Sequence, residues 1–338
     1  MTQTIQDLCT LGGTSGREQA VRDYIKSLLP QEAKTITDNL GNLLVFREGR
    51  QRSKNKVMLC AHMDEVGVIV TGIGADGLLS FAAVGGIDPR VILGRRILFD
   101  NGILGVVGLT PVHLIDHADR QKMPKIDDMY IDIGAKDKDD AQQYLSPGDT
   151  GVFDSDFVSF GDCKIKGKAL DDRVGCAVLI DLLREQPEYD MWAAFTTREE
   201  VGLVGAKTAA FGVAPDYAIV LETTTAADII GVSGEKQVCV LGRGAAVSFM
   251  DKTTVYDPDL YKKAFELADA NHIAIQPKTV VAGGNDAGVI HKSRAGVRTL
   301  TVNTPCRYLH SASCVCDTRD IESVRALACV LFEDFCNA

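Results

Sequence analysis

The sequence predicts an α/β fold in which a β-rich segment interrupts one α/β domain. Short apolar runs typical of buried parallel strands alternate with helical patterns in both terminal parts of the chain. Between about residues 67 and 160 the pattern changes to closely spaced β runs that Gly, Pro and Asp separate. The 338 residues are enough for about two domains. We therefore expect a discontinuous α/β domain with a small β-barrel or sandwich inserted in it.

The first part of the chain is expected to form one helix and the first strands of the sheet. Ser15-Gly16-Arg17-Glu18 has the pattern of a capping box, and apolar residues at helical spacing follow it as far as Pro30. A turn at 38–42 leads into a strand at 43–46. The run at 57–60 is continuous and apolar, as expected for a central parallel strand.

The remaining elements follow from the same patterns. In the insertion, we expect strands at 68–72, 78–84, 91–99, 104–109 and 129–133. Helical periodicity returns at Arg173, and apolar runs at 191–195, 217–221 and 299–302 predict further buried strands. Helices are predicted near 260–270 and 319–336.

Composition excludes several classes of function. The net charge of −10 disfavours nucleic acid and acidic membranes as partners, because binding to phosphates needs clustered Lys and Arg. The ten cysteines are scattered, without a Cys-x-x-Cys pair, which suits a reducing compartment better than a disulfide framework. The N-terminus lacks the basic segment and following apolar region typical of a signal peptide, and no apolar run approaches membrane length. We expect a cytoplasmic protein.

Acidic and imidazole side chains follow several of the predicted strands or begin the next helix. Because ligands bind outside the carboxyl ends of the strands in an open α/β sheet, these side chains should meet there. Taken singly, each has a structural alternative: a histidine is often only hydrogen-bonded, and Asp171 could be a helix N-cap. Together they form a mixed N/O ligand set without thiolate, which suits zinc, cobalt or manganese in a hydrolytic site. The set comprises His62, Asp64, Asp171, Glu199, Glu200, Glu222 and His310.

Two divalent metal ions use this set better than one, with zinc as the first expectation. Asp171 is the natural bridge; His62 and Glu222 would complete one metal, and Glu200 and His310 the other. The remaining two residues are assigned supporting and catalytic roles. Asp64 would accept a hydrogen bond from the ring N–H of His62 that does not face the metal. Glu199 would be the general base that takes a proton from a metal-bridging water.

Seven segments resemble the dinuclear metallo-aminopeptidases of the tetrahedral, glutamyl and deblocking type. Five belong to the expected α/β domain, namely AHMDEVG (61–67), KALDDRVGC (168–176), TTREEVGLVGA (196–206), GGNDAGVIH (283–291) and RYLHS (307–311). Two lie in the insertion, namely GGIDPRVILG (85–94) and KIDDMYIDIGA (125–135). The resemblance spans nearly the whole chain in collinear order.

The resemblance implies a zinc-peptidase-like three-layer catalytic domain at 1–66 and 162–338, and an inserted dimerisation domain at 67–161. It also implies dimers that assemble into a dodecamer, and stepwise removal of N-terminal residues from peptides with free N-termini. Matched position by position, it assigns the same five ligands, with Glu199 as base and Asp64 behind His62. Family members commonly have Asp where this chain has Glu222, which leaves metal preference at that position open.

Several alternatives remain at this point. The same chemistry could act on another amide, as in a carboxypeptidase or an N-acyl amino-acid deacylase, or the protein could be an idle assembly that keeps its metals for structure. Relatives labelled cellulase or endoglucanase give no support for glycosidase activity, which needs two carboxylates flanking a sugar. The preferred N-terminal residue is also open. A preference for acidic residues would need a cation in the pocket, for which Arg243, Lys292 and Arg307 are candidates, although each suits a surface charge better.

Overall fold

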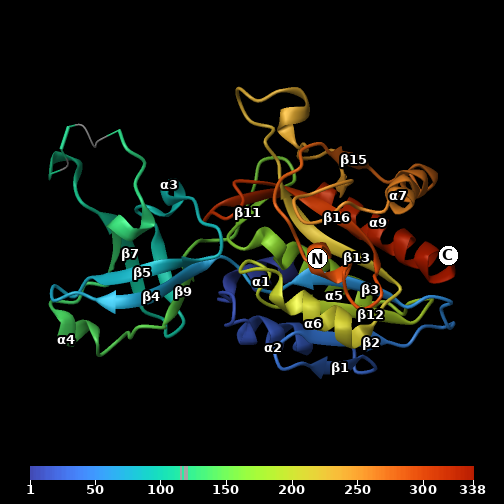
Figure 1. Cartoon of the computed structure of the whole chain (residues 1–338), viewed down its shortest axis with the longest axis horizontal. Coiled ribbons are helices and arrows are strands. Elements are labelled where there is room, and N and C mark those ends of the chain that lie inside the picture. The colour runs from blue at the N-terminus through green and yellow to red at the C-terminus, as the bar shows by residue number, and fades with distance from the viewer. Residues whose placement is uncertain (115, 118–120) are drawn as a thin grey trace.

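The computed structural model describes residues 1–114, 116–117 and 121–338, and it confirms the predicted α/β fold. A mixed eleven-stranded sheet forms the centre of the larger part, and a closed six-stranded barrel lies beside it (Figure 1). The strands of the barrel are consecutive in sequence, whereas the sheet takes strands from both ends of the chain. The chain leaves the sheet after β3 (Val57–His62) and returns to it at β10 (Val158–Phe160).

Four parallel strands form the middle of the sheet, in the order β12 (Met191–Thr196), β3, β13 (Tyr217–Thr225) and β16 (Arg298–Arg307). Every residue of β3 is buried, as are all but the last of β13, which explains why these strands are uniformly apolar at their amino-terminal ends. Because they run in the same direction, their carboxyl ends meet at one edge. The sheet is extended by β1 (Lys34–Thr37), β2 (Leu43–Arg47), β17 (Cys314–Asp317), β11 (Lys164–Gly167), β10, β14 (Ala245–Ser248) and β15 (Ile275–Lys278).

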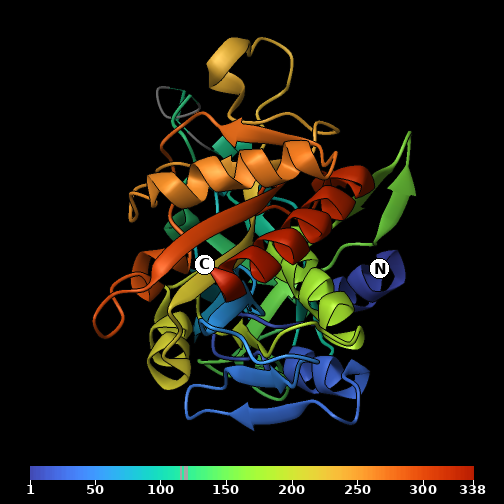
Figure 2. The same ribbon diagram turned by 90° about the vertical axis from the view of Figure 1, so that its right-hand side faces the viewer.

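Helices cover both faces of the sheet and give a three-layer arrangement. Side chains alternate along β3, so that Val57 and Leu59 belong to one apolar core while Met58 and Cys60 belong to the other. Figure 2 shows α7 and α9 lying across the strands on the first face. That face is covered by α1 (Thr2–Thr10), α2 (Gln19–Leu28), α5 (Leu170–Arg184), α7 (Pro258–Ala270) and α9 (Thr318–Asn337). The second face is covered by α6 (Val204–Val213) and α8 (Ala287–Ile290).

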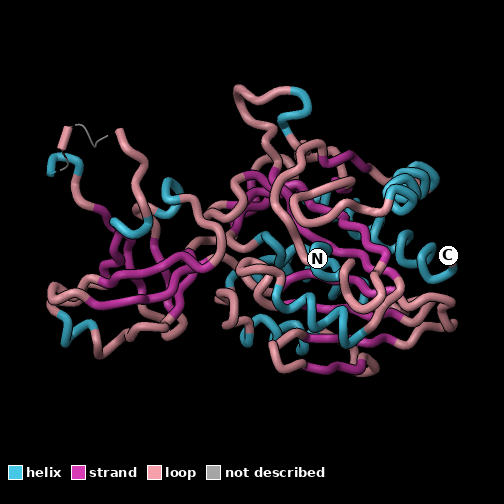
Figure 3. Tube along the Cα trace, in the orientation of Figure 1, coloured by secondary structure: helices cyan, strands magenta, loops and turns pink. Residues whose placement is uncertain are grey.

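The barrel has an apolar core of its own, which includes Val68, Phe81, Ile97 and Phe153. Figure 3 shows this part as strands and loops with only short helices. Its closed strand order is β4 (Gly67–Ile73), β5 (Leu79–Val84), β8 (Met129–Asp132), β7 (Leu104–Leu109), β6 (Arg96–Phe99) and β9 (Thr150–Phe153). The short helical turns are α3 (Pro89–Ile92), α4 (Lys138–Ala141), η1 (Val112–Leu114) and η2 (Ile126–Asp128), and η3 (Gly234–Gln237) lies outside the barrel.

One prediction for the insertion is wrong in detail, and one strand was missed. The expected strand at 91–99 is in fact α3 followed by β6, because Asp88 caps the helix by accepting a hydrogen bond from Arg90 N and Pro89 occupies its first position. The strand β9 was not predicted. It contains Gly151, where a Cβ atom would lie 2.7 Å from the Ile97 side chain, so that the barrel closes there only with glycine.

Three helices of the α/β part, α1, α2 and α6, also differ from the prediction. The capping box is wrong: α2 begins at Gln19, and the Ser15 hydroxyl instead donates a 2.6 Å hydrogen bond to Asp64 Oδ2. Helices α1 and α6 were not predicted. Helix α6 contacts the sheet through small residues such as Ala206, Ala209 and Ala210. It therefore lacks the stripe of large apolar residues by which amphipathic helices are predicted from sequence.

The predicted C-terminal helix is confirmed as α9, and its start is tied to the sheet by Asp317. This buried carboxylate accepts hydrogen bonds from Arg319 N at 2.9 Å and Lys164 Nζ at 2.6 Å. Burial acts to raise the pKa of Asp317, but the hydrogen bonds from Arg319 and Lys164 outweigh it and lower the pKa to about 2. Among the described residues, no helix is both long and apolar enough to cross a bilayer.

Candidate active site

The predicted site residues come together at the carboxyl edge of the parallel strands. His62 is the last residue of β3, and Glu222 lies in β13, which is longer than predicted. Glu199 and Glu200 lie on the loop between β12 and α6, Asp171 at the start of α5, and His310 on the loop after β16. The sheet topology therefore gathers into one place residues that are up to 248 positions apart, from His62 to His310.

His62 is buried, and its two ring nitrogens have separate environments. Nδ1 lies 3.1 Å from the backbone oxygen of Asp64 and 3.5 Å from the Oδ1 atom of the same residue. Nε2 lies 3.2 Å from Asp171 Oδ1 and 3.5 Å from Glu222 Oε1. The nearest acceptor for Nδ1–H is thus the backbone carbonyl and not the predicted carboxylate. This contact orients the ring so that Nε2 faces the two carboxylates.

Asp171 lies between the two histidines. Its Oδ1 atom is 3.2 Å from His62 Nε2, and its Oδ2 atom is 3.3 Å from His310 Nε2. Its backbone dihedral angles are not helical although it lies in the first turn of α5, and the peptide bond to Asp172 is cis. One carboxylate therefore presents one oxygen to each imidazole, which is the arrangement of a bridging ligand.

His310 completes the other side of the cluster. Its Nε2 atom lies 3.4 Å from Glu200 Oε2 in addition to Asp171. Its Nδ1 atom lies 2.8 Å from the backbone oxygen of Gly86, which belongs to the loop after barrel strand β5. The inserted segment therefore fixes the orientation of an imidazole of the site.

Asp64 organises the loop that carries the two glutamates. Its Oδ1 atom accepts a hydrogen bond from Glu199 N at 3.0 Å, and its Oδ2 atom accepts one from Glu200 N at 3.2 Å. Oδ2 also accepts the Ser15 hydroxyl. Asp64 therefore connects three segments of the chain, namely the one that contains Ser15, its own segment after His62, and the loop that carries the two glutamates. The sequence did not predict this role of Ser15, because Ser15 follows no strand of the sheet.

The site carries more carboxylates than imidazoles, and burial acts against their charges. Burial is the largest cause that raises the pKa of Glu200 to about 7 and of Glu222 to about 8, and it raises the pKa of Glu199 well above its usual value. Burial also acts to raise the pKa of Asp171, but the two histidines outweigh it and hold that pKa well below its usual range. Such an excess of buried negative charge is offset best by cations.

Two further buried carboxylates were not assigned to the site from the sequence. One potential ligand atom each from Asp172, His62 and Glu222 lie within 4.8 Å of one another. The Oδ2 atom of Asp172 has no hydrogen-bond partner among the described residues. Asp286 accepts hydrogen bonds from Thr196 Oγ1 at 2.5 Å and from Cys60 Sγ at 3.6 Å. Burial raises the pKa of Asp286 to about 6.

The donor set fits divalent metal ions. Ligand atoms that lie about 2.0–2.1 Å from a tetrahedral zinc ion are about 3.3–3.4 Å from one another. The four distances from His62 and His310 Nε2 atoms to carboxylate oxygens are 3.2, 3.5, 3.3 and 3.4 Å. One potential ligand atom each from Glu200, His62 and Asp171 also lie within 4.8 Å of one another. Spacing and chemistry both match a site for two hard or borderline cations.

A cavity of about 600 Å³ opens onto this cluster. Its wall includes Asp171, Glu199, Glu200, Glu222 and His310. The rest of its wall is formed by the end of β13, the loop at 282–284 and the side chains of Val238, Thr253, Lys278 and Leu309, among others. Its size suits an amino-acid residue with its neighbours.

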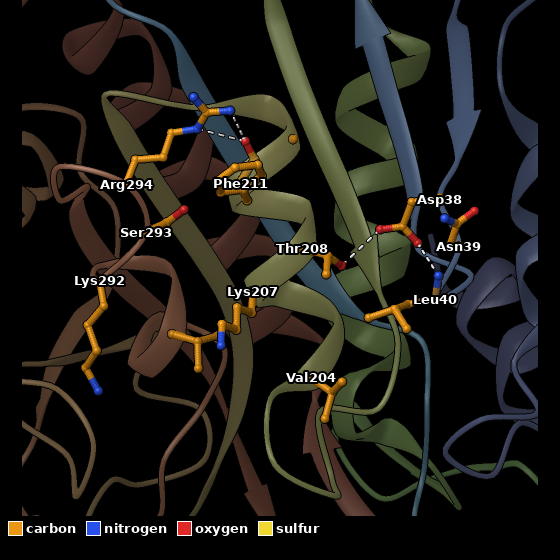
Figure 4. A pocket seen from close by; sticks show the side chains of 12 residues that line it. Asp38, Asn39, Leu40, Val204, Lys207, Thr208, Phe211, Lys292, Ser293 and Arg294 are labelled. Atoms are coloured by element: carbon orange, nitrogen blue, oxygen red, sulfur yellow. Dashed lines mark hydrogen bonds between the residues drawn. The ribbon is translucent and has the colours of Figure 1, made fainter.

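The cations proposed from the sequence for this pocket lie elsewhere. Arg307 forms a bidentate ion pair with Asp228, with both distances 2.7 Å, and Arg243 is exposed. Lys292 lines a different cavity of about 790 Å³, together with Lys207 and Phe211 (Figure 4). Among the described residues, the one lysine or arginine that lines the active-site cavity is Lys278, at the end of the edge strand β15, and no sequence pattern predicted a site there.

The comparison with known families agrees with this geometry. Residues 41–327 match the family described as M42 glutamyl aminopeptidase. The chain belongs to the M42 glutamyl aminopeptidase family. As a member of the M42 family it is a peptide hydrolase with aminopeptidase function.

Curated M42 relatives match along nearly their whole length. A putative aminopeptidase of Acetivibrio thermocellus is 36% identical over 96% of this chain and 95% of its own. A lysyl aminopeptidase of Pyrococcus furiosus is 32% identical over 95% and 94%. A glutamyl aminopeptidase of Lactococcus lactis is 30% identical over 91% and 88%. The names of the last two relatives specify different residues, lysyl in one and glutamyl in the other.

Solved structures show the same fold. An aminopeptidase from Desulfurococcus kamchatkensis superposes with a TM-score of 0.92 at 34% identity, covering 98% of this chain and 94% of its own. The TET1 peptidase of Pyrococcus horikoshii, described as assembling into a tetrahedron or a large octahedral shell, gives 0.86 at 33% identity, with 98% of each chain covered. A Thermotoga maritima protein named as an endoglucanase gives 0.80 at 34% identity, covering 98% and 97%.

Proposed function

We propose that this protein is a dinuclear-metal aminopeptidase that removes N-terminal residues from peptides with free N-termini. The observation that carries the proposal is the Asp171 carboxylate, which has one oxygen near each of two histidine Nε2 atoms. The names of the relatives, which are aminopeptidases, support a substrate with a free N-terminus. No glycosidase activity is expected, because the carboxylates described at this cavity lie in a cluster with histidines, whereas a glycosidase needs two carboxylates that flank a sugar.

In this proposal, five residues hold the metal ions. His62 and Glu222 would hold one ion, Glu200 and His310 would hold the other, and the Asp171 carboxylate, which lies near both histidines, would contribute to both. Bound divalent ions supply Lewis acidity, which polarises a carbonyl and lowers the pKa of water. Zinc is the first expectation for this mixed N/O set, and cobalt or manganese also fit it.

Glu199 acts as the general base. It lines the cavity, and its carboxylate makes no hydrogen bond or ion pair with the described residues, so that it is free to reach a water molecule or the substrate. Its backbone is held by Asp64 Oδ1 at 3.0 Å, which limits where the side chain can lie. The carboxylate takes a proton from the attacking water and gives it to the leaving amine nitrogen.

We further propose that residues 1–66 and 162–338 form the catalytic domain and residues 67–161 a dimerisation domain, in a cytoplasmic dodecamer. The relatives named as tetrahedral peptidases, including a structure described as a dodecamer, support assembly. All ten cysteines are unpaired, in keeping with a reducing compartment. Light scattering coupled to size exclusion tests the assembly, and a monomer at micromolar concentration would contradict it.

The central experiment measures release of Leu-p-nitroanilide after chelation and after adding back Zn²⁺, Co²⁺ or Mn²⁺. Activity should disappear with chelation and return with a metal. Glu199→Gln should lower kcat by about 10²–10⁴-fold while it still binds metal, because the general base is lost but the ligands remain. Glu266→Gln, on the exposed side of α7, is a matched control that should leave activity unchanged.

Blocked substrates separate this function from its rivals. N-acetyl-Leu-p-nitroanilide should not be cleaved, because it lacks the free α-amino group. Cleavage of the blocked substrate with none of the free one would favour the deacylase, and release of C-terminal residues from peptides would favour the carboxypeptidase. No turnover of any amide with any metal would favour an assembly that keeps its metals for structure.

A further inference from the structure

Strand β13 continues past its neighbour β3 in the wall of the active-site cavity. It pairs with β3 only as far as Val220, whereas its pairing with β16 continues to Thr225. Among the described strands, residues 221–225 therefore have a partner on one side only. The last three of these residues, all threonines, line the cavity. The end of β13 is thus an open strand edge that borders the cavity.

Hydrogen bonds at both ends of β13 show which of its backbone groups face the open side. Just before the strand, Asp216 O accepts a hydrogen bond from the first residue of β16, at 3.1 Å. Just after it, Ala226 N donates one to a backbone oxygen near the other end of β16, at 2.8 Å. The register between the two strands is continuous, and backbone groups of successive residues in a strand point to alternate sides. The even-numbered residues therefore face β16, and Thr223 and Thr225 face the open side.

Two backbone groups on the open side are left for a ligand. Thr223 N is not one of them, because it already donates to Glu222 Oε1 at 3.0 Å. Thr225 O accepts a hydrogen bond from the Cys239 thiol at 3.5 Å. Thr223 O and Thr225 N have no partner on this side among the described residues. In a parallel ladder, one residue of the neighbouring strand donates to the C=O of residue i and accepts from the N–H of residue i + 2, which is the pair left open here.

The direction of this edge fits a peptide whose N-terminus lies at the metal cluster. Glu222, one of the proposed metal ligands, is the residue just before the open pair. From there the strand goes from the buried Thr223 to the exposed Thr225, so that the edge leads from the cluster toward solvent. A peptide that leaves the cluster along this edge runs in the same direction as β13. The open groups therefore have the spacing and the polarity that such a peptide needs.

We propose that the open edge of β13 binds the main chain of the substrate as an additional parallel strand. A peptide residue after the scissile bond donates its N–H to Thr223 O and accepts a hydrogen bond at its C=O from Thr225 N. The inference rests on the proposed aminopeptidase function. Because the edge contacts main-chain groups only, it favours substrates that continue as a peptide after the scissile bond, whatever their side chains are.

Proline at position 225 removes one of the two groups, because proline lacks the backbone N–H. The measured quantity is the ratio of kcat/KM for Leu-Ala-Ala-Ala-amide to kcat/KM for Leu-p-nitroanilide, which has no peptide C=O after the scissile bond. Thr225→Pro should lower this ratio about fivefold, as expected for the loss of one hydrogen bond. An unchanged ratio would overturn the proposal, because it would show that the proline affects both substrates alike or neither.

Thr225→Ala separates the backbone from the side chain, because it keeps the N–H. The ratio of the two substrates in this variant should stay within about twofold of the wild-type ratio, since a main-chain contact does not depend on the hydroxyl. A fall equal to that in Thr225→Pro would assign the effect to the side chain and would overturn the proposal.

A second measurement uses the zinc-loaded wild-type enzyme, so that it does not depend on the folding of a variant. Leu-methylamide, Leu-Ala-amide and Leu-Ala-Ala-amide share a secondary amide as scissile bond and differ in the number of peptide groups after it. The value of kcat/KM should rise about fivefold or more at the step that adds the paired residue. A series without such a step would contradict the proposal.

Failure of the proposed function would look different from failure of this inference. No turnover of Leu-p-nitroanilide or of any peptide, with any metal, would sink the aminopeptidase function. Turnover of all these substrates, with a flat series and an unchanged ratio in Thr225→Pro, would sink the strand-edge inference alone.

Discussion

Replacing Glu65 by glutamine should destabilise the protein by about 3–5 kcal/mol, because it leaves two buried cations without their anion. Glu65 accepts hydrogen bonds from Lys168 Nζ at 2.7 and 2.9 Å and from Arg173 Nη2 at 3.2 Å. All three side chains are at most 4% exposed. The two cations also donate to backbone oxygens at the end of α1, including Leu11, so that the network docks this helix onto α5.

Urea unfolding followed by fluorescence of Trp192 measures the change. This residue is the one tryptophan of the sequence, and its ring lies 5.1 Å from that of Phe46 across β12 and β2, so that unfolding changes its surroundings. Glu266→Gln is the control, because its ion pairs with Lys262 and Lys263 are exposed and should be worth less than about 0.5 kcal/mol. A loss below about 1 kcal/mol for Glu65→Gln would refute the reasoning that the buried cations depend on this carboxylate.

Three further predictions concern a buried ion pair, a hydrogen bond at the active site and a glycine in a close contact. Asp317→Asn should destabilise the protein by about 2.5 kcal/mol at pH 7, since the folded pKa of about 2 lies below the usual 3.8. This stabilisation is present above about pH 4 and is lost as pH falls toward 2, so urea midpoints of variant and wild type should converge there; a constant gap would contradict it. Ser15→Ala should lower kcat about tenfold, with little change in KM for Leu-p-nitroanilide, because the 2.6 Å hydrogen bond that steadies Asp64 is lost. Gly85→Ala should cost more stability in thermal unfolding than Gly94→Ala. Both have positive φ, but only the Gly85 Cβ would lie 2.9 Å from another side chain, and equal losses would show that this contact is unimportant.

Sequence patterns predicted the parts of the fold that depend on burial of whole strands. The run at 57–60 became β3 and the run at 217–221 became β13, because strands covered on both faces must be apolar throughout. Elements held by close backbone approach were missed. Helix α6 packs through alanines, and β9 contains Gly151 where a side chain would clash, and neither leaves an apolar periodicity.

The site was predictable to the extent that topology alone determines it. His62 and Glu222 meet because their parallel strands are neighbours, and a strand order of this kind brings their ends together whatever the loops do. Contacts made by loops could not be foreseen. The bond from Ser15 to Asp64, and the place of Lys278 in the cavity wall, depend on how segments far apart in sequence cross one another. Local propensity carries no information about such crossings.

The bond between His310 Nδ1 and the carbonyl of Gly86 means that the barrel is not a removable module. A shortened protein in which a linker replaces residues 67–161 would lose only the edge strand β10 from the sheet and would keep both of its apolar cores, yet one imidazole would lose the acceptor that sets its ring plane. The same bond makes the active site sensitive to the angle between barrel and sheet. A neighbouring subunit that restricts movement of the barrel would therefore also restrict His310. In this way contacts between subunits would affect the geometry of each active site.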